Sequence, residues 1–485
     1  MASCDSSSTK SGCGSVGAAD FSASLTPLQA DKAVLHPCYS RNAHHRYARM
    51  HLAVAPACNL QCHYCNRKYD CSNESRPGVV SEVLTPAQAI AKARQVAAAL
   101  PQLSVIGIAG PGDPLANIAR TFNTLEGLRL ALPDIKLCLS TNGLALPEVV
   151  DRLVEVGVDH VTVTVNALDV DIAAQIYPWL WVDGSRVEGR EAAAILLERQ
   201  QAGIRLLSAR GVLVKINSVL IPGVNDHHLP AVSEKAREWG AFLHNVMPLI
   251  SQPEHGTVYG LRGQREPTSA EVDQVRSRCG GSMPQMAHCQ QCRADAIGML
   301  GEDRSQSFPL SSVPTTQVPY LPILRQRAQI QAGIASQGES ESAGACLVAV
   351  ATRNGIAIDE HFGHVRRFQI YSVSAAGIIS IGERFTPPFC TDKNVCEADN
   401  AREHEQRLTA LVDLLGDMAA VFCARIGMGP WQQLEQAGIE PHIKGAWQPL
   451  METVAQWWRQ RETAADNGGA NSHAARPDTD IKGVA

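Results

Sequence analysis

The chain has 485 residues, 45% of them hydrophobic and 19% charged, and its formal net charge is −5. This length exceeds what one core serves, the mild charge argues against nucleic acid as the main partner, and no apolar run is long enough to cross a bilayer. Fifteen cysteines without an export signal indicate reduced thiols and metal ligands in a reducing cytoplasm.

The chain begins with a stretch rich in Ser, Gly and Ala, residues 1–30, that we expect to be disordered. Directly after it, residues 36–45 contain one thiol, Cys38, and three imidazoles, His36, His44 and His45. Surface histidines are common, so this group gains weight only from its closeness to the cysteines that follow.

Three cysteines, Cys58, Cys62 and Cys65, fall within eight residues, after an apolar run over residues 51–55 that predicts a strand. Thiolates select zinc, cuprous copper or iron–sulfur clusters, and a structural zinc site normally has four ligands. A cubane held by three cysteines leaves one iron open for a substrate. The spacing resembles the cluster loop of radical S-adenosylmethionine (SAM) enzymes; the alternatives are a chance cluster and half of a zinc ribbon.

From residue 50 the sequence alternates between strand and helix patterns. Thr85 as N-cap, followed by Pro86, marks the start of the first helix. Six βα repeats with apolar strands predict an α/β fold, a partial (βα)6 TIM-like barrel whose chemistry lies at the carboxyl ends of its strands. We predict strands near 51–55, 104–109, 136–141, 160–165, 212–220 and 242–249, and helices near 85–100, 116–131, 147–156, 187–203 and 228–239.

Polar or glycine-rich segments follow these predicted strands. Gly112 lets the backbone approach a ligand closely, and Asp113 offers an acceptor for an ammonium group. Each such residue alone is as well explained by a turn or a cap, but their recurrence at one rim favours a ligand site. The segments are 110–114, 138–143, 164–166 and 215–225.

A second cysteine pair, Cys289 and Cys292, has two intervening residues. This spacing suits a redox-active pair or half of a metal site. In this chain a second cluster is the favoured interpretation, with Cys71 as the natural third ligand and Cys279 as a competitor.

The composition shifts to Ser, Gln, Pro and Gly over residues 301–343, which predicts a flexible linker with a short helix near 323–331. Residues 344–462 predict a compact α/β domain with a strand near 346–351 and a hairpin of strands near 368–373 and 378–381. A helix near 399–416 and a strand near 420–424 follow, and residues 463–485 predict a disordered tail.

The combined motifs resemble those of the NifB family of radical SAM proteins, which build the precursor of the nitrogenase iron–molybdenum cofactor. The resemblance covers nearly all of the ordered chain. It implies a radical SAM barrel with auxiliary cluster-binding extensions over residues 31–300 and a NifX/NafY-like, RNase H-like cofactor-binding domain over residues 344–462. The motifs are His36-Pro37-Cys38, Ala43-His44-His45, the loop Cys58 to Cys65, residues 73–77, residues 110–114, residues 289–296, residues 360–364 and residues 427–430.

The resemblance implies a lyase-like radical SAM enzyme that fuses two [4Fe–4S] clusters and inserts a carbide derived from SAM, giving an eight-iron precursor. One SAM donates a methyl group, and a second is cleaved reductively to a 5′-deoxyadenosyl radical. The implied cofactors are a [4Fe–4S] SAM cluster, SAM and two auxiliary [4Fe–4S] clusters that serve as substrates. The implied partners are iron–sulfur cluster donors, an electron donor and downstream cofactor carriers or scaffolds, without nucleic acid or membrane.

The resemblance also implies residue roles. The three-cysteine loop holds the SAM cluster. Glu74 and Arg76 are candidates for proton handling or for shielding the site, with a structural ion pair as the alternative. The residues implied to contact SAM are Tyr64, Gly112, Asp113, Thr164 and Ile216. The ligands implied for one substrate cluster are Cys71, Cys289 and Cys292. Those implied for the other are Cys38, Cys138 and His44, with His36 and His45 as open alternatives to His44.

Two other classes of protein stay open. One is another radical SAM enzyme with auxiliary clusters, although such enzymes usually carry cysteine-rich C-terminal modules. The other is a non-catalytic iron–sulfur scaffold, against which the complete polar rim of the barrel argues. Formation of 5′-deoxyadenosine separates an enzyme from a scaffold.

Overall fold

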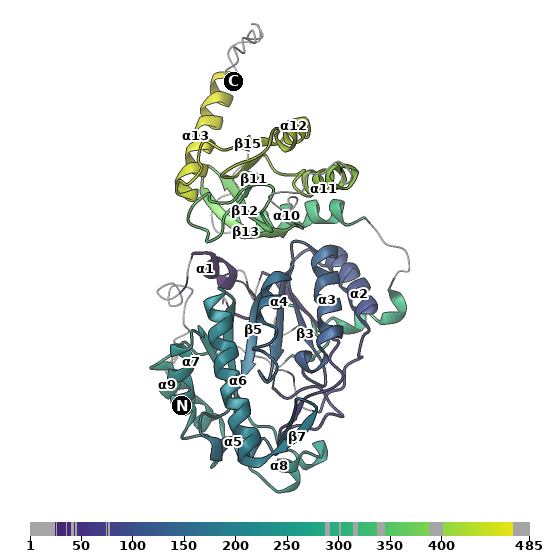
Figure 1. Ribbon diagram of the computed structural model, residues 1–485, viewed down its shortest axis with the longest axis vertical. Helices are drawn as coiled ribbons and strands as arrows, with labels where there is room; N and C mark the ends of the chain where they lie inside the picture. Colours follow the sequence, from purple (N-terminus) through teal and green to yellow (C-terminus); the bar gives the residue numbers. More distant parts are fainter. Residues whose placement is uncertain are drawn as a thin grey trace, which may run out of the picture. The chain divides into compact units, whose positions relative to one another are not determined.

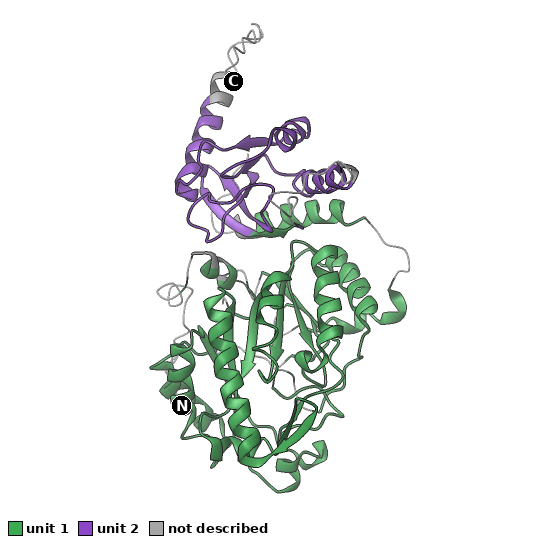
Figure 2. Ribbon diagram, in the orientation of Figure 1, with its two compact units in different colours: residues 1–334, 382–386 green, residues 335–381, 387–485 purple. Residues whose placement is uncertain are grey.

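The structure is a computed structural model that describes residues 25, 27–34, 36–39, 43, 46–73, 75, 78–286, 292–299, 302–313, 319–336, 345–387 and 401–468 (Figure 1). The chain divides into two compact units, residues 1–334 with 382–386 and residues 335–381 with 387–485 (Figure 2). None of the helices that the structure describes combines the length and hydropathy needed to cross a lipid bilayer.

The first unit is built on a seven-stranded sheet of order β10-β1-β3-β4-β5-β8-β9. Six strands pair in parallel and β10 pairs antiparallel to β1, so the predicted partial barrel of six βα repeats is confirmed. The strands are β1 (Ala48–Ala53), β3 (Leu103–Ala109), β4 (Lys136–Thr141), β5 (Val158–Thr164), β8 (Leu213–Leu220), β9 (Leu243–Pro248) and β10 (Ile297–Gly298).

Helices cover the outer face of this sheet, as α3, α4 and α6 do in Figure 1. The first of them, α2, begins as predicted: Thr85 and Gln88 form a reciprocal capping box and Pro86 occupies the first turn. The crossover helices are α2 (Pro86–Ala99), α3 (Ile118–Ala131), α4 (Val150–Glu155), α6 (Gly189–Ala209) and α7 (Leu229–Glu238), with a short 3-10 turn, η3 (Pro114–Asn117), before α3.

Several smaller elements extend the barrel beyond the predicted repeats. Strand β2 (Leu60–Gln61) pairs with the hairpin of β6 (Trp179–Val182) and β7 (Ser185–Glu188) to form a separate three-stranded sheet. Helix α1 (Pro27–Val34) begins inside the segment predicted to be disordered. The others are α5 (Val170–Ile176), η4 (Pro253–His255), α8 (Val258–Leu261), α9 (Ser269–Gly280), η5 (Ser305–Ser307) and η6 (Leu310–Ser312).

Helix α10 (Tyr320–Ser336) contains the short helix predicted near 323–331, within the predicted linker over residues 301–343. Arg327 on this helix is only 1% exposed, forms an ion pair with Asp134 at 2.9 Å, and donates to the Leu103 carbonyl at 2.6 Å. Tyr320 donates to the other oxygen of Asp134 at 2.8 Å. The helix is therefore docked on the first unit at the amino end of the sheet, and the composition-based prediction of a free linker was wrong for residues 320–334.

The second unit has a five-stranded mixed sheet of order β13-β12-β11-β14-β15. Strand β12 pairs antiparallel to β11, whereas β14 and β15 continue the sheet in parallel. The predicted strands and first helix are confirmed. Elements α12, β15 and α13 were not predicted, and α13 continues to Gly468, inside the tail predicted to be disordered from residue 463. The elements are β11 (Cys346–Val350), β12 (Arg367–Ser374), β13 (Gly377–Phe385), α11 (Ala401–Leu414), β14 (Ala420–Phe422), α12 (Met428–Gln436), β15 (Glu440–His442) and α13 (Leu450–Gly468).

The two faces of the barrel sheet differ in chemistry. Alternation along β4 sends Leu137 and Leu139 into the core shared with the helices, whereas Cys138 and Ser140 are half-exposed on the inner face. The outer face thus supplies the hydrophobic core and the inner face is left for polar side chains. The position of the functional site follows from this separation.

Candidate functional site

The three-cysteine loop directly follows β1 and is held open by its own hydrogen bonds. The Cys65 amide donates to the Cys62 carbonyl at 3.1 Å. The Gln61 side-chain amide donates to the carbonyls of Cys62 and Cys65 at 2.9 and 2.8 Å. Pairing of β2 with β6 fixes the far side of the loop, so its backbone is rigid at the positions that carry sulfur.

The thiols of this loop interact with one another. Burial raises the pKa of Cys62 well above its ordinary value, and the neighbouring thiols of Cys65 and Cys58 raise it further. Burial likewise raises the pKa of Cys58 to about 12. Thiolates in this position therefore require a bound cation or cluster to hold their charge.

The same loop favours a cluster over a single ion. Among the residues that the structure describes, no three His, Cys, Asp or Glu side chains converge on one point as a single metal ion requires. A cluster offers each thiolate its own iron and so tolerates wider spacing. Three cysteines on one loop, Cys62 buried and Cys58 and Cys65 partly buried, fit a [4Fe–4S] cluster with one open iron.

Glycines let the loop after β3 lie directly against the cysteine loop. A Cβ atom at Gly112 would lie 1.9 Å from the Ala57 carbonyl oxygen, so only glycine fits there. The amides of Gly112 and Asp113 donate to the carbonyls of Ala55 and Ala57, both at 2.9 Å. These hydrogen bonds hold the start of the cysteine loop against the loop that follows β3.

The Asp113 carboxylate accepts more hydrogen bonds from the protein than the sequence alone indicated. Its carboxylate accepts from the Asn142 amide at 2.6 Å, the Leu115 amide at 2.8 Å and the Thr141 hydroxyl at 3.0 Å. Burial raises its pKa to about 6 despite these donors. The carboxylate therefore ties the ends of β3 and β4 together, and little of its acceptor capacity remains for a ligand.

A buried amide network joins the cysteine loop to the strand ends. The Tyr64 hydroxyl donates to Asn73 at 2.6 Å and accepts from Asn166 at 2.7 Å. Asn217 donates to the Asn73 carbonyl at 2.7 Å, while its own oxygen accepts from Asn245 at 3.2 Å. The Asn245 oxygen has no partner among the described residues, so it can accept from a ligand.

Two residues predicted to contact SAM, Ile216 and Thr164, are both buried. Ile216 is fully buried in the core between sheet and helices, so its side chain points away from the inner face. Thr164 is also buried, and its carbonyl accepts from Gln200 at 2.8 Å. Any contact with a ligand through Ile216 must therefore come from its backbone.

A second group of ligating side chains lies side by side across the inner face. His51, Gly107, Cys138 and His160 are register partners on four neighbouring strands. A Cβ atom on Gly107 would lie 3.1 Å from the Cys138 sulfur and 3.2 Å from the His51 ring. Gly107 thus leaves the space in which the thiol and the imidazole approach each other.

His51 has the geometry of a ligand held by a backbone acceptor. Its Nδ1 lies 3.0 Å from the Arg293 carbonyl, and burial lowers its pKa to about 4. A neutral ring that donates through Nδ1 leaves Nε2 with a free lone pair, the arrangement typical of metal-binding histidines. The sequence analysis missed this residue, although a histidine within an apolar strand was its signal.

Cys38 is brought to the same region as Cys138. Burial raises the pKa of Tyr39 well above its usual range, and the thiols of Cys138 and Cys38 both add to the shift. The Tyr39 ring stacks on the His36 ring with 4.0 Å between their centroids, and the centroids of the His36 and His160 rings are 4.5 Å apart. The His36 Nε2 atom and both ring nitrogens of His160 have no partner among the described residues.

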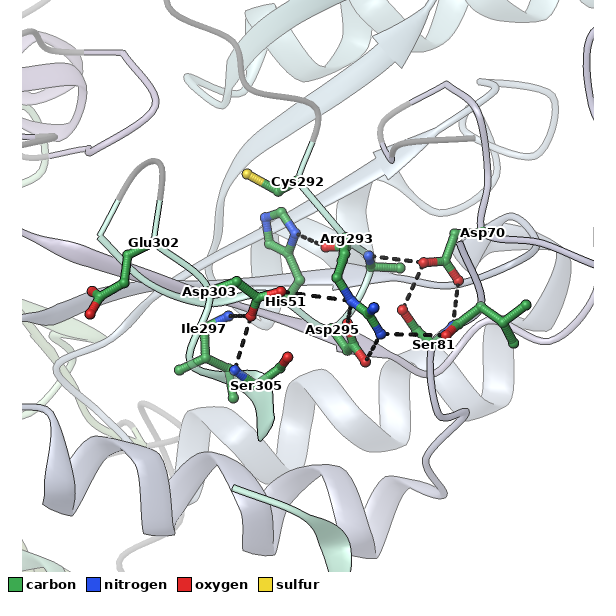
Figure 3. A network of polar contacts seen from close by, with 12 residues as sticks. His51, Asp70, Ser81, Cys292, Arg293, Asp295, Ile297, Glu302, Asp303 and Ser305 are labelled. Atoms are coloured by element: carbon green, nitrogen blue, oxygen red, sulfur yellow. Dashed lines mark hydrogen bonds and ion pairs between the residues drawn. The ribbon is translucent and has the colours of Figure 1, made fainter. Parts of the chain in front are cut away.

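Cys292 lies beside a network of charged side chains (Figure 3), and Cys71 directly follows Asp70 of that network in the chain. The Cys71 amide donates to the Gly110 carbonyl at the end of β3. Its neighbour Asp70 accepts from the Ala294 amide at 3.2 Å, and Arg293 forms an ion pair with Asp295 at 2.8 Å. This network ties the segment that carries Cys292 to the segment that carries Cys71.

Four predicted site residues lie outside the part of the chain that the structure describes: His44, Glu74, Arg76 and Cys289. The site residues that were not predicted are His51, Arg49, His160 and Asn245, whereas Asn166 and Asn217 lie in the polar segments predicted to form a ligand site.

The fold and its cysteine loop define a radical SAM protein. Residues 52–236 match the Radical SAM superfamily, and residues 344–460 match the family described as dinitrogenase iron-molybdenum cofactor. Among solved structures, coproporphyrinogen III oxidase from Escherichia coli aligns with a TM-score of 0.30 at 14% identity, covering 49% of this chain and 53% of that one.

The chain belongs to the family of the FeMo cofactor biosynthesis protein NifB. It is 64% identical to the Klebsiella pneumoniae protein of that name over 95% of this chain and 97% of that protein. It is 49% identical to the Azotobacter vinelandii protein over 88% of each chain. A radical SAM role in FeMo cofactor biosynthesis follows from this membership.

Proposed function

We propose that this chain fuses two [4Fe–4S] clusters and inserts a SAM-derived carbide, which makes the eight-iron precursor of the iron–molybdenum cofactor. The reaction is lyase-like and runs in a reducing cytoplasm that keeps the cysteines free. The observation that carries the proposal is the 64% identity to a FeMo cofactor biosynthesis protein over nearly the full length of both chains. The polar inner face of the barrel provides independent support.

Cys58, Cys62 and Cys65 would hold the [4Fe–4S] cluster, which with SAM supplies a 5′-deoxyadenosyl radical when bound. The residues of the chain bind and orient SAM. Its contacts are assigned to Tyr64, Gly112, Asp113, Thr164 and Ile216, with Asp113 acting chiefly on the loop and Ile216 through its backbone.

One substrate cluster is assigned to Cys38, Cys138 and a histidine. His51 is a better candidate than His44 because its ring lies beside the Cys138 sulfur across Gly107. A mixed site with an imidazole ligand releases its cluster more readily than a site of thiolates alone.

The other substrate cluster is assigned to Cys71, Cys289 and Cys292. The charged network of Figure 3 supports this assignment because it joins the segments of Cys71 and Cys292. Glu74 and Arg76, next to the anchored Asn73, are proposed to handle protons or to shield the site.

The second unit is proposed to receive the product through His361 and His364. Their rings lie 5.0 Å apart, and the His361 Nδ1 atom accepts from the Gly363 amide at 2.9 Å, which orients the ring. Cluster donors, an electron donor and downstream carriers are the proposed partners. Two neighbouring imidazoles suit an exposed iron of the finished cluster.

The test is a Cys62→Ala variant, reconstituted without oxygen. We expect 5′-deoxyadenosine from SAM, measured by mass spectrometry, to fall below detection, while iron at the other two sites remains. The matched control is Cys279→Ala, which removes another fully buried thiol that packs in the helix-side core. Undiminished 5′-deoxyadenosine from Cys62→Ala, or full loss from Cys279→Ala, would contradict the assignment.

A further inference from the structure

Arg49 is a buried cation on the inner side of β1, only 2% exposed. Its Nη1 donates to the carbonyls of Gly298 at 2.5 Å and Met299 at 2.7 Å, and more weakly to Glu302 at 3.3 Å. Its Nη2 donates to the Cys292 sulfur at 3.0 Å. The guanidinium therefore binds one thiol and several backbone dipoles.

Among the residues that the structure describes, no carboxylate pairs with the charge of Arg49. Within the described part of the chain, none of its acceptors is an acid, and its Nε–H has no acceptor. Burying an unpaired cation costs several kcal/mol even after the protein relaxes. Arg327 is buried to the same degree and binds backbone carbonyls in the same way, but it faces Asp134 at 2.9 Å. The contrast indicates that an anion outside the described residues completes the site of Arg49.

The position of Arg49 identifies that anion. Arg49 and His51 lie on the same side of β1, and both bind the segment that follows Cys292. Arg49 binds it through the carbonyls of Gly298, Met299 and Glu302, and His51 through the Arg293 carbonyl. The sulfur at 3.0 Å is that of a proposed cluster ligand. A thiolate bound to an iron–sulfur cluster carries negative charge, and hydrogen bonds to its sulfur are among the factors that set the reduction potential.

We propose that Arg49 is the counter-charge and positioning residue of the iron–sulfur cluster held by Cys292. This inference rests on the proposed function, which assigns a cluster to that cysteine. The guanidinium stabilises the ligated thiolate, offsets the charge of the cluster and fixes the Cys292 segment against β1. Without the cluster, its buried charge destabilises the protein.

The test compares Arg49→Met, Arg49→Lys and Arg327→Met in the full-length chain. Iron and sulfide are counted after anaerobic reconstitution, reduction potentials are measured by EPR titration, and the Tm is measured with and without clusters. We expect Arg49→Met to lose the iron of one cluster while the Tm of its apo-protein stays equal to or above that of the parent. Arg49→Lys, which keeps the charge, should recover the iron with that cluster shifted to a lower potential. Arg327→Met should lower the Tm of the apo-protein and leave iron per folded chain unchanged.

Two results would overturn the proposal. Arg49→Met with full iron and unchanged potentials means that the cluster does not depend on the guanidinium. An apo-protein of Arg49→Met that loses stability as Arg327→Met does means that Arg49 only ties two segments together. Cys292→Ala separates this failure from that of the proposed function: if it keeps all its iron, the cluster assignment itself is wrong.

Discussion

The inner face of the barrel and the amino end of its sheet both bury charged side chains. At the amino end, other residues of the protein pair with the buried charge, whereas on the inner face the described residues leave some polar atoms without a partner. At the amino end, Arg327 meets Asp134 and a set of backbone carbonyls, and the Asp134 carboxylate also accepts from Tyr320. On the inner face, Arg49 has no acid, and neither ring nitrogen of His160 has a partner among the described residues.

This difference distinguishes buried polar groups that stabilise the fold from those that we expect to bind a ligand. A buried polar group normally has a partner, because an unpaired one costs about 1–3 kcal/mol. Where the partners are all present, as around Arg327, the group stabilises the fold. Where the partners among the described residues are incomplete on one continuous face, as around His160 and Asn245, we expect a ligand to supply them.

The largest effect that tests this comparison is expected from truncation. A chain ending after Ser336 keeps α10, whereas a chain ending after Asp303 loses it and leaves Asp134 without its cation. We expect the shorter chain to be unstable or insoluble and the longer one to fold, bind iron and form 5′-deoxyadenosine. Equal Tm values for the two truncated proteins would show that α10 does not stabilise the barrel.

Arg327→Met tests the same contact with one substitution. Removing one member of a buried ion pair costs about 3–5 kcal/mol, because the other charge stays buried. We expect a loss of that size in the free energy of unfolding, measured by denaturant titration. Adding Asp134→Asn should recover part of the loss. A loss below about 1 kcal/mol would mean that water reaches Asp134 and replaces the guanidinium.

Gly107→Ala tests the inner face, with a smaller effect on stability. The new methyl group would crowd the Cys138 sulfur and the His51 ring, at 3.1 and 3.2 Å. Overpacking of this kind costs about 1–3 kcal/mol, and we expect the iron of one substrate cluster to be lost with it. Gly429→Ala is the matched control, because nothing lies within 4 Å of its added methyl. Full iron in Gly107→Ala would exclude the pairing of Cys138 with His51.

The sequence was sufficient to predict the features that depend on local residue patterns. Strand and helix periods predicted the six parallel strands, and the spacing of Cys58, Cys62 and Cys65 predicted the loop. It was not sufficient for contacts between distant segments: a ligand role for His51 depends on its register with Gly107 and Cys138, which only strand pairing sets. The docking of α10 was missed for the same reason, since Arg327 lies far from Asp134 in the chain.

The smallest expected effect is a pH dependence of stability that His244 contributes. Its ring is fully buried, its Nε2 lies 2.9 Å from the Ser218 hydroxyl, and burial lowers its pKa to about 3. In the unfolded chain this histidine binds a proton near pH 6.5, whereas in the folded chain it stays neutral until about pH 3. The free energy of unfolding therefore falls as the pH falls from 6.5 toward 3.

For one such histidine the loss is about 1.4 kcal/mol per pH unit, or about 2 kcal/mol at pH 5 relative to pH 7. Other neutral buried histidines, such as His36, His51 and His160, add to the slope. We therefore expect His244→Gln to reduce the slope of unfolding free energy between pH 7 and pH 5 by one proton, measured on cluster-free protein. If His244→Gln keeps the slope of the parent, His244 is protonated in the folded protein, and the helix side of β9 is wetter than its burial indicates.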